Sequence, residues 1–160
     1  MPEVVVKLRG AGDTLQAAFS DLRQAMFQHD HPVRVRYGET DQMGYVYYGR
    51  YAEFFEVGRV ETMRALGISY KQLEQEGVLL PVHELHVRYH RPARYDDALT
   101  IRTTIVARPT VRIVFRYGLY DAAGVLLTEG ETTLVFVDAR TGRPRQAPEH
   151  LLAALAPYFN

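Results

Sequence analysis

A single acidic side chain, Asp41, lies in the polar segment that precedes the longest helix predicted by the sequence. A carboxylate at such a place can act as a general base on water or as a nucleophile that forms a transient anhydride. The first turn of a helix carries unpaired backbone N–H groups and a partial positive charge, which can stabilise an oxyanion. Turn geometry also favours an Asp in the segment Thr-Asp-Gln-Met-Gly, so this residue has a purely structural explanation as well.

Three histidines follow one another along a predicted strand, at positions 83, 86 and 90. A period of two places His83 on the face opposite His86 and His90, so the three cannot converge on a metal ion from that strand. No metal site is therefore expected, whereas His83 alone could line a pocket near Asp41. The chain has no cysteine, no Gly-x-Ser-x-Gly elbow and no Walker-type loop, which excludes thiolate chemistry and two common catalytic motifs.

The composition is that of an ordinary globular protein, and 160 residues suit one domain. The 19 basic and 19 acidic side chains cancel, so there is no bulk attraction to nucleic acid or to an anionic membrane. No run approaches the ~18 consecutive apolar residues of a membrane span, and the first residues lack the basic and apolar regions of a secretory signal. The sequence therefore predicts a soluble cytoplasmic protein with no nucleic-acid or membrane partner.

Residues 1–30 are expected to form an N-terminal extension, and residues 31–160 the main domain. In the extension, Asp13 is placed to cap an amphipathic helix whose apolar face comprises Leu15, Ala18, Phe19, Leu22 and Met26. The glycines at 10 and 12 are similar to the opening of a dinucleotide-binding fold, but no third glycine and no crossover follow. A packing helix is the preferred interpretation.

The main domain is predicted to begin with a half-exposed strand at Val33 and to continue with a helix from Tyr48 to Leu66. The buried stripe of this helix is expected to comprise Tyr51, Phe54, Phe55, Gly58, Thr62, Ala65 and Leu66. Gly67 is placed for a left-handed C-cap, and Gly58 indicates that another element approaches the helix closely. The remaining predicted elements are a short helix at 69–76, four strands at 80–90, 99–107, 111–120 and 125–137, and a terminal helix at 148–158.

Short turns between the last three strands predict an antiparallel meander. One antiparallel sheet with a single long apolar helix predicts an α+β architecture in which the sheet wraps around the helix. Such a sheet has free edges and an uncovered face, and pairing with a second copy of the chain removes both. The sequence therefore predicts a homodimer, with a tetramer as a further level of assembly.

Two segments of the main domain resemble the signature of hotdog-fold acyl-CoA thioesterases of the 4-hydroxybenzoyl-CoA thioesterase type. In Tyr37–Tyr51, a strand is followed by Asp41, two variable residues, Gly44 and an aromatic stretch that leads into the long helix. The second segment, Tyr89–Ile101, is similar to the connection between the second and third strands of that family. The resemblance covers about residues 33–138 and implies the hotdog fold.

The resemblance implies an acyl-CoA thioesterase in which Asp41 is the general base or nucleophile and the backbone N–H near Tyr48 is the oxyanion donor. The leaving thiol has a solution pKa of about 8.5, as for cysteine, so a single carboxylate can suffice. The site is expected between subunits, with Gly44 allowing close approach of the thioester and Tyr47 and Tyr51 as candidate walls of the acyl pocket. His83 is a further candidate for the pocket, and Arg91, Arg108 and Arg112 are candidates for binding the phosphates of coenzyme A. No cofactor is implied, because coenzyme A is part of the substrate.

Two alternative functions stay open. A hotdog enoyl-CoA hydratase or dehydratase usually pairs a His with the carboxylate, and Val46 stands at the fifth position after Asp41, where that His would be. A non-catalytic acyl-CoA-binding module would hold the ligand without turnover. The thiol carrier, coenzyme A or an acyl carrier protein, also stays open.

Overall fold

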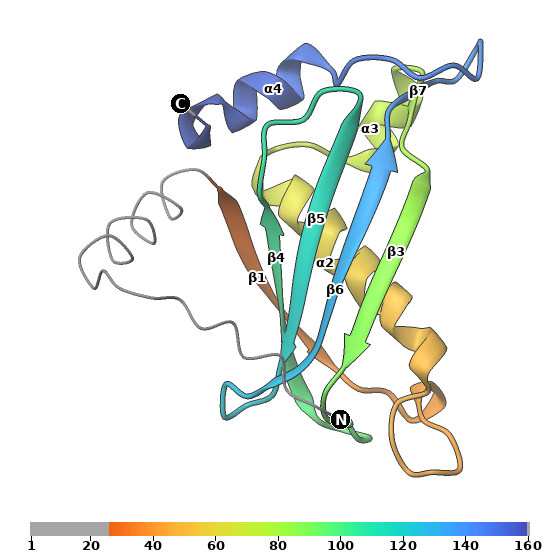
Figure 1. Cartoon of the computed structure of the whole chain (residues 1–160), viewed down its shortest axis with the longest axis vertical. Helices are drawn as coiled ribbons and strands as arrows, with labels where there is room; N and C mark the ends of the chain where they lie inside the picture. Colours follow the sequence, from red (N-terminus) through yellow and green to blue (C-terminus); the bar gives the residue numbers. More distant parts are fainter. Residues whose placement is uncertain (1–25, 160) are drawn as a thin grey trace, which may run out of the picture.

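The computed structural model describes residues 26–159, in which one five-stranded antiparallel sheet packs against a long helix (Figure 1). The sheet order is β1-β4-β5-β6-β3, so the last three long strands form the predicted meander. The strands are β1 (Phe27–Arg34), β3 (Val82–Tyr89), β4 (Ala98–Ile105), β5 (Arg112–Tyr120) and β6 (Leu126–Val135). The long helix is α2 (Tyr51–Ala65), and the predicted α+β architecture is confirmed.

Smaller elements surround this core. The helices are α3 (Tyr70–Gln75) and α4 (Glu149–Leu155), with 3-10 turns η1 (Tyr37–Glu39), η2 (Tyr48–Arg50) and η3 (Ala156–Tyr158). A two-stranded sheet pairs β2 (Val78–Leu79) with β7 (Val137–Asp138). No helix within residues 26–159 combines the length and the apolarity that crossing a bilayer requires. The predicted amphipathic helix of the N-terminal extension lies outside the described residues.

The central strands bury every second side chain, which is why they form a half-covered sheet. In β4, Leu99, Ile101, Thr103 and Ile105 are buried and the residues between them are more exposed. In β5, Ile113, Phe115, Tyr117 and Leu119 are buried, and of the residues between them only Gly118 is buried as well. The buried face is the one that meets α2, because the ring of Phe55 stacks on that of Tyr117 with centroids 4.5 Å apart. The hydrophobic core thus lies between α2 and this face.

The close approach that Gly58 predicted is confirmed. A Cβ atom at Gly58 would lie 2.5 Å from Oγ1 of Thr103 and 2.7 Å from Cγ2 of Ile101, so α2 rests directly on β4. Gly67 has a φ of +78° and ends the helix as predicted. The buried stripe differs from the prediction at its end, because Met63 is buried and Ala65 is exposed. The first three residues of the predicted helix form η2 rather than α-helix.

The first strand begins at Phe27, six residues before the predicted start at Val33, so residues 27–30 belong to the sheet and not to the extension. Side chains alternate along the whole strand between half-buried and exposed. His29 and His31 occupy the half-buried positions, and their rings are 6.5 Å apart. Polar imidazoles at those positions hid the alternation from a search for apolar residues.

Two strands form the edges of the sheet within the described chain. At one edge, β1 contains Pro32, which cannot donate a backbone hydrogen bond to a further strand. At the other edge, nearly every residue of β3 is exposed, including Val82 (47%), Leu85 (44%) and Tyr89 (47%). The β3 edge therefore leaves apolar side chains and backbone groups available for pairing.

Candidate active site

The start of α2, the end of β3 and the start of β4 lie together at one end of the molecule (Figure 1). The chain enters the helix through η2, which no side chain caps. The two N–H groups that precede η2 are already hydrogen-bonded: that of Val46 donates to the carbonyl of Ala93 (2.8 Å), and that of Tyr47 donates to the carbonyl of Glu39 (2.9 Å). The N–H groups of Tyr48 and Gly49 have no partner among residues 26–159. The predicted oxyanion donor is therefore free.

Asp41 lies in a closed loop just before this turn. Its Oδ1 accepts a hydrogen bond from the N–H of Met43 (2.8 Å), and its carbonyl accepts one from the N–H of Gly44 (3.0 Å). The side chain is partly buried, and its Oδ2 has no hydrogen-bond or ion-pair partner within the described chain. Gly44 has a φ of +82°, a conformation that glycine adopts without strain. The loop thus holds one carboxylate oxygen and leaves the other free.

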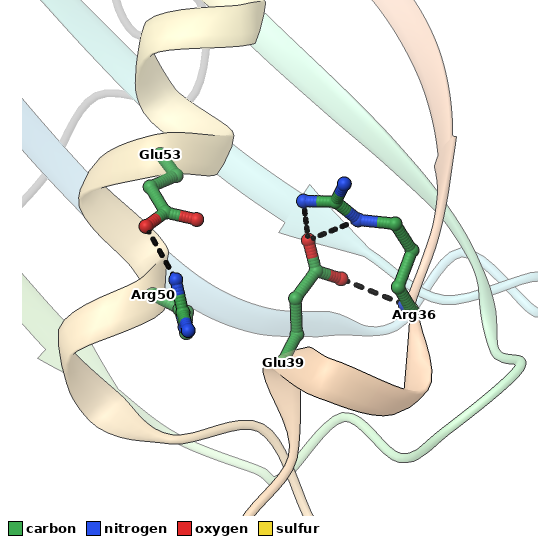
Figure 2. A network of polar contacts seen from close by, with 4 residues as sticks. All are labelled: Arg36, Glu39, Arg50 and Glu53. Carbon is green, nitrogen blue, oxygen red and sulfur yellow. Dashed lines mark hydrogen bonds and ion pairs between the residues drawn. The ribbon is translucent and has the colours of Figure 1, made fainter.

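The buried carboxylate of Glu39 holds the segment that leads into the Asp41 loop (Figure 2). Its oxygens accept hydrogen bonds from the backbone N–H of Arg36 (2.7 Å) and from Nε of the same residue (3.0 Å), and they pair with Nη2 at 2.9 Å. Arg50 of η2 and Glu53 of the first turn of α2 form a separate ion pair at 2.8 Å. Because the carbonyl of Glu39 also receives the N–H of Tyr47, the same residue anchors both sides of the Asp41 loop.

A cavity of about 380 Å³ opens beside the loop and the helix start. Its walls are mainly aromatic and apolar, with one arginine and one histidine: Met43, Tyr45, Val46, Tyr48, Tyr51, Tyr89, His90, Arg91 and Pro92. Of the residues predicted to bind substrate, Tyr51 and Arg91 line this cavity. Tyr47 does not, since its ring lies over Gly49, where a Cβ atom would be 2.7 Å from Cε1 of the ring.

Sequence reasoning gave no substrate-binding role to Tyr89 and His90, which line this cavity. Both belong to the second segment of the family signature, so that segment was the available signal. Burial raises the pKa of both Tyr51 and Tyr89 above its ordinary value, so these two phenols stay protonated at neutral pH. A hydrogen bond with Tyr48 likewise raises the pKa of Tyr47.

Three other predicted site residues lie at the opposite end of the sheet. Arg108 follows β4 and Arg112 begins β5, about 25 Å from the Asp41 end, given an eight-residue strand at ~3.3 Å per residue. His83 and Arg112 line a second cavity of about 340 Å³ there. The described chain therefore does not bring His83, Arg108 or Arg112 to Asp41 by itself.

The predicted orientation of His83 was wrong. The pairing of β3 with β6 shifts between Val82 and Glu84, so a β-bulge reverses the alternation at His83. The Nε2 atoms of His83 and His86 both lie 3.8 Å from the carboxylate of Glu84, on one face of the strand. In the part of the chain that the structure describes, no three His, Asp or Glu side chains gather in a way that could hold a metal ion.

The fold is that of a hotdog protein, with an antiparallel sheet against one long helix whose first turn has no side-chain cap. Residues 35–155 match the model of the thioesterase-like superfamily. The acyl-CoA thioester hydrolase YbgC of Escherichia coli is 38% identical over 122 residues, which cover 76% of this chain and 91% of that protein.

Two solved structures share the fold. The DHNA-CoA thioesterase of Staphylococcus aureus matches with a TM-score of 0.76 at 30% identity, covering 82% of this chain and 88% of that one. The protein TT1821 of Thermus thermophilus also has a TM-score of 0.76, at 34% identity, covering 81% and 98%. The chain belongs to the thioesterase-like superfamily, which confirms the predicted hotdog fold and the predicted class of thioester hydrolase.

Proposed function

We propose that this protein hydrolyses acyl-CoA thioesters, with Asp41 activating the attack and the start of α2 binding the oxyanion. The observation that carries the proposal is the free Oδ2 of Asp41 in the loop that leads to the unpaired N–H groups of Tyr48 and Gly49. Tyr48 lines the aromatic cavity together with Met43 and Tyr45 of the Asp41 loop, whereas Asp41 itself is not among the lining residues. When a thioester carbonyl binds at the start of α2, the free N–H groups serve as oxyanion donors and Asp41 in the preceding loop serves as the activating carboxylate.

In the reaction, the carboxylate of Asp41 takes a proton from water, and the resulting hydroxide attacks the thioester carbon. The negative charge that develops on the carbonyl oxygen is stabilised by the N–H groups of η2 and by the positive end of the α2 dipole. The C–S bond then breaks, the thiolate leaves, and the carboxylic acid is released. A direct attack by Asp41, with an anhydride that water then opens, uses the same atoms.

Coenzyme A is the proposed thiol carrier, because two relatives of 30% identity or more are named for CoA thioesters, whereas the relatives named for acyl-acyl carrier protein are 28% and 29% identical. The aromatic wall formed by Tyr48, Tyr51 and Tyr89 suits the acyl group. At the rim of this cavity, Arg91 is exposed and is placed to meet the phosphates of the carrier.

We also propose that the site is completed by a second copy of the chain, joined through the β3 edges. A two-fold axis pairs these edges in antiparallel fashion, which places the Val82 end of one strand beside the Tyr89 end of the other. His83, Arg108 and Arg112 of the second copy then come from the far end of their own sheet to the Asp41 end of the first. In this assembly, His83, Arg108 and Arg112 of one copy share a site with Asp41 of the other, although they lie about 25 Å from Asp41 within one chain.

The β3 edge is preferred over the β1 edge because β1 contains Pro32, whereas β3 exposes Leu85 near its centre. Light scattering should therefore give at least a dimer mass, and Leu85→Lys should shift it to the monomer and remove activity. The matched control, Gln28→Lys on the exposed side of β1, should leave the mass unchanged. A Leu85→Lys variant that keeps the full mass contradicts this assembly.

The activity is tested by free-thiol release from a panel of aromatic, short-chain and long-chain acyl-CoAs and from acyl-acyl carrier protein. Thiol release from acyl-CoA supports the proposal. Hydration of an enoyl-CoA without thiol release identifies the hydratase alternative instead. Saturable binding without either reaction identifies a binding module and contradicts the proposal.

A further inference from the structure

The last residue of β3, Tyr89, links the edge of the sheet to the helix start. Its hydroxyl donates a hydrogen bond of 2.9 Å to the carbonyl of Tyr48, which lies 41 residues earlier in the chain. Its ring meets that of Tyr51 edge to face, with centroids 5.1 Å apart and planes at 76°. Tyr89 thus contacts both η2 and the first residue of α2.

This hydrogen bond acts on the peptide unit that also contains the N–H of Gly49. Because a peptide unit is planar, holding the carbonyl oxygen of Tyr48 also fixes the direction in which the N–H of Gly49 points. A donor on the carbonyl oxygen polarises the same unit and makes its N–H a stronger donor. That N–H has no partner among residues 26–159, so it is available to a ligand.

The other contacts of Gly49 leave little freedom for an alternative arrangement. The ring of Tyr47 lies over its α-carbon, and the rings of Tyr47 and Tyr48 are 4.6 Å apart. Burial raises the pKa of Tyr89, and its proximity to Tyr48 raises it further, so the phenol remains a donor throughout the neutral range. The hydroxyl of Tyr89 therefore stays able to donate to the carbonyl of Tyr48 at neutral pH.

We propose that Tyr89 is a positioning residue that orients and polarises the Tyr48–Gly49 peptide as part of the oxyanion site. The inference rests on the proposed thioesterase function and extends it. Tyr89 acts through the backbone of η2 and takes no proton from the substrate. Since β3 is also the proposed subunit edge, the same tyrosine makes the geometry of the oxyanion site depend on correct pairing of the two subunits.

The test is Tyr89→Phe, which removes the hydroxyl and keeps the ring that packs on Tyr51. We expect kcat to fall about tenfold, less than the 10²–10³-fold loss of a direct oxyanion donor, with KM and the urea midpoint unchanged. Tyr95→Phe is the matched control, because Tyr95 is an exposed tyrosine at the same end that packs on Tyr37 outside the cavity. This control should keep full activity.

A second measurement does not depend on turnover. The infrared carbonyl band of a bound acyl-CoA ketone analogue, in which CH₂ replaces sulfur, reports the strength of the oxyanion site. The carbonyl band of the bound analogue should lie at a higher frequency in Tyr89→Phe than in the wild type. In Tyr95→Phe it should lie at the wild-type frequency. A wild type that hydrolyses no acyl-CoA refutes the proposed function, and the band then decides the role of Tyr89. An unchanged kcat, or an unchanged band, overturns the role assigned to Tyr89.

Discussion

The distance between α2 and the sheet places the helix start relative to the Asp41 loop, and Gly58 sets that distance. Gly58→Ala adds a single methyl group whose carbon would lie 2.5 Å from Oγ1 of Thr103 and 2.7 Å from Cγ2 of Ile101. Both neighbours are β-branched and fully buried, so neither can rotate away. The helix or the strand must therefore shift.

Two opposing effects set the size of the change. Alanine is favoured over glycine inside a helix by about 1 kcal/mol. Overpacking a well-filled core costs about 1–3 kcal/mol. The clash involves two buried atoms of the sheet, so we expect a penalty of about 2–3 kcal/mol, in the upper part of this range, and a net fall in the free energy of unfolding of about 1–2 kcal/mol. This corresponds to a melting temperature about 3–6 °C lower. Turnover should fall as well, because the helix start moves with α2.

Urea denaturation at a fixed protein concentration is the assay, since an oligomer unfolds in a concentration-dependent way. Gly38→Ala is the control, because a Cβ atom there would meet nothing within 4 Å, and it should leave the midpoint almost unchanged. In a Thr103→Ala background the penalty of Gly58→Ala should shrink, because the nearest clashing atom is gone. A Gly58→Ala protein as stable as the wild type, or more stable, refutes the reasoning.

Three further changes have defined outcomes. Gly44→Ala places a side chain at a φ of +82°, so it should lower the free energy of unfolding by about 1–2 kcal/mol and lower turnover as well; an unchanged urea midpoint contradicts this. Glu39→Gln weakens the contacts with Arg36 and should lower the free energy of unfolding by about 1–2 kcal/mol. A urea midpoint equal to that of the wild type shows that these contacts do not stabilise the fold. A hydrogen bond of 2.8 Å from the backbone N–H of Thr141 holds the pKa of Asp138 below its usual 3.8. That stabilisation is present above pH 3.8 and is lost as the pH falls through the lower value in the folded protein, so Asp138→Ala should melt below the wild type at pH 7, with the gap closing in acid. A gap that does not depend on pH contradicts this assignment.

The sequence predicted the elements whose patterns are local. The alternation of Ile113, Phe115 and Tyr117 identified β5, and the glycines at 58 and 67 identified a close contact and a helix end. The start of β1 was missed because histidines occupy its inner positions. A local pattern is sufficient to identify a strand such as β5, because its alternation of buried and exposed side chains repeats over a few residues.

Features that depend on pairing between distant segments could not be predicted. The bulge at His83 arises from the register of β3 against β6, and the bulged residues Val82–Glu84 include no glycine or proline. The contact between Tyr89 and Tyr48 joins residues that only the folded sheet brings together. The positions of Asp41 and Tyr48 at one end, by contrast, followed from a motif that is continuous in the sequence.

The central claim is that the free carboxylate oxygen of Asp41 drives hydrolysis at the helix start. Asp41→Asn tests it most directly, because the amide oxygen can still accept the N–H of Met43 and preserve the loop. Thiol release and calorimetric binding of an acyl-CoA should be measured on the same preparation. The account predicts a loss of about 10³-fold in kcat with nearly unchanged affinity. A variant that binds the substrate and turns it over at the wild-type rate contradicts the account.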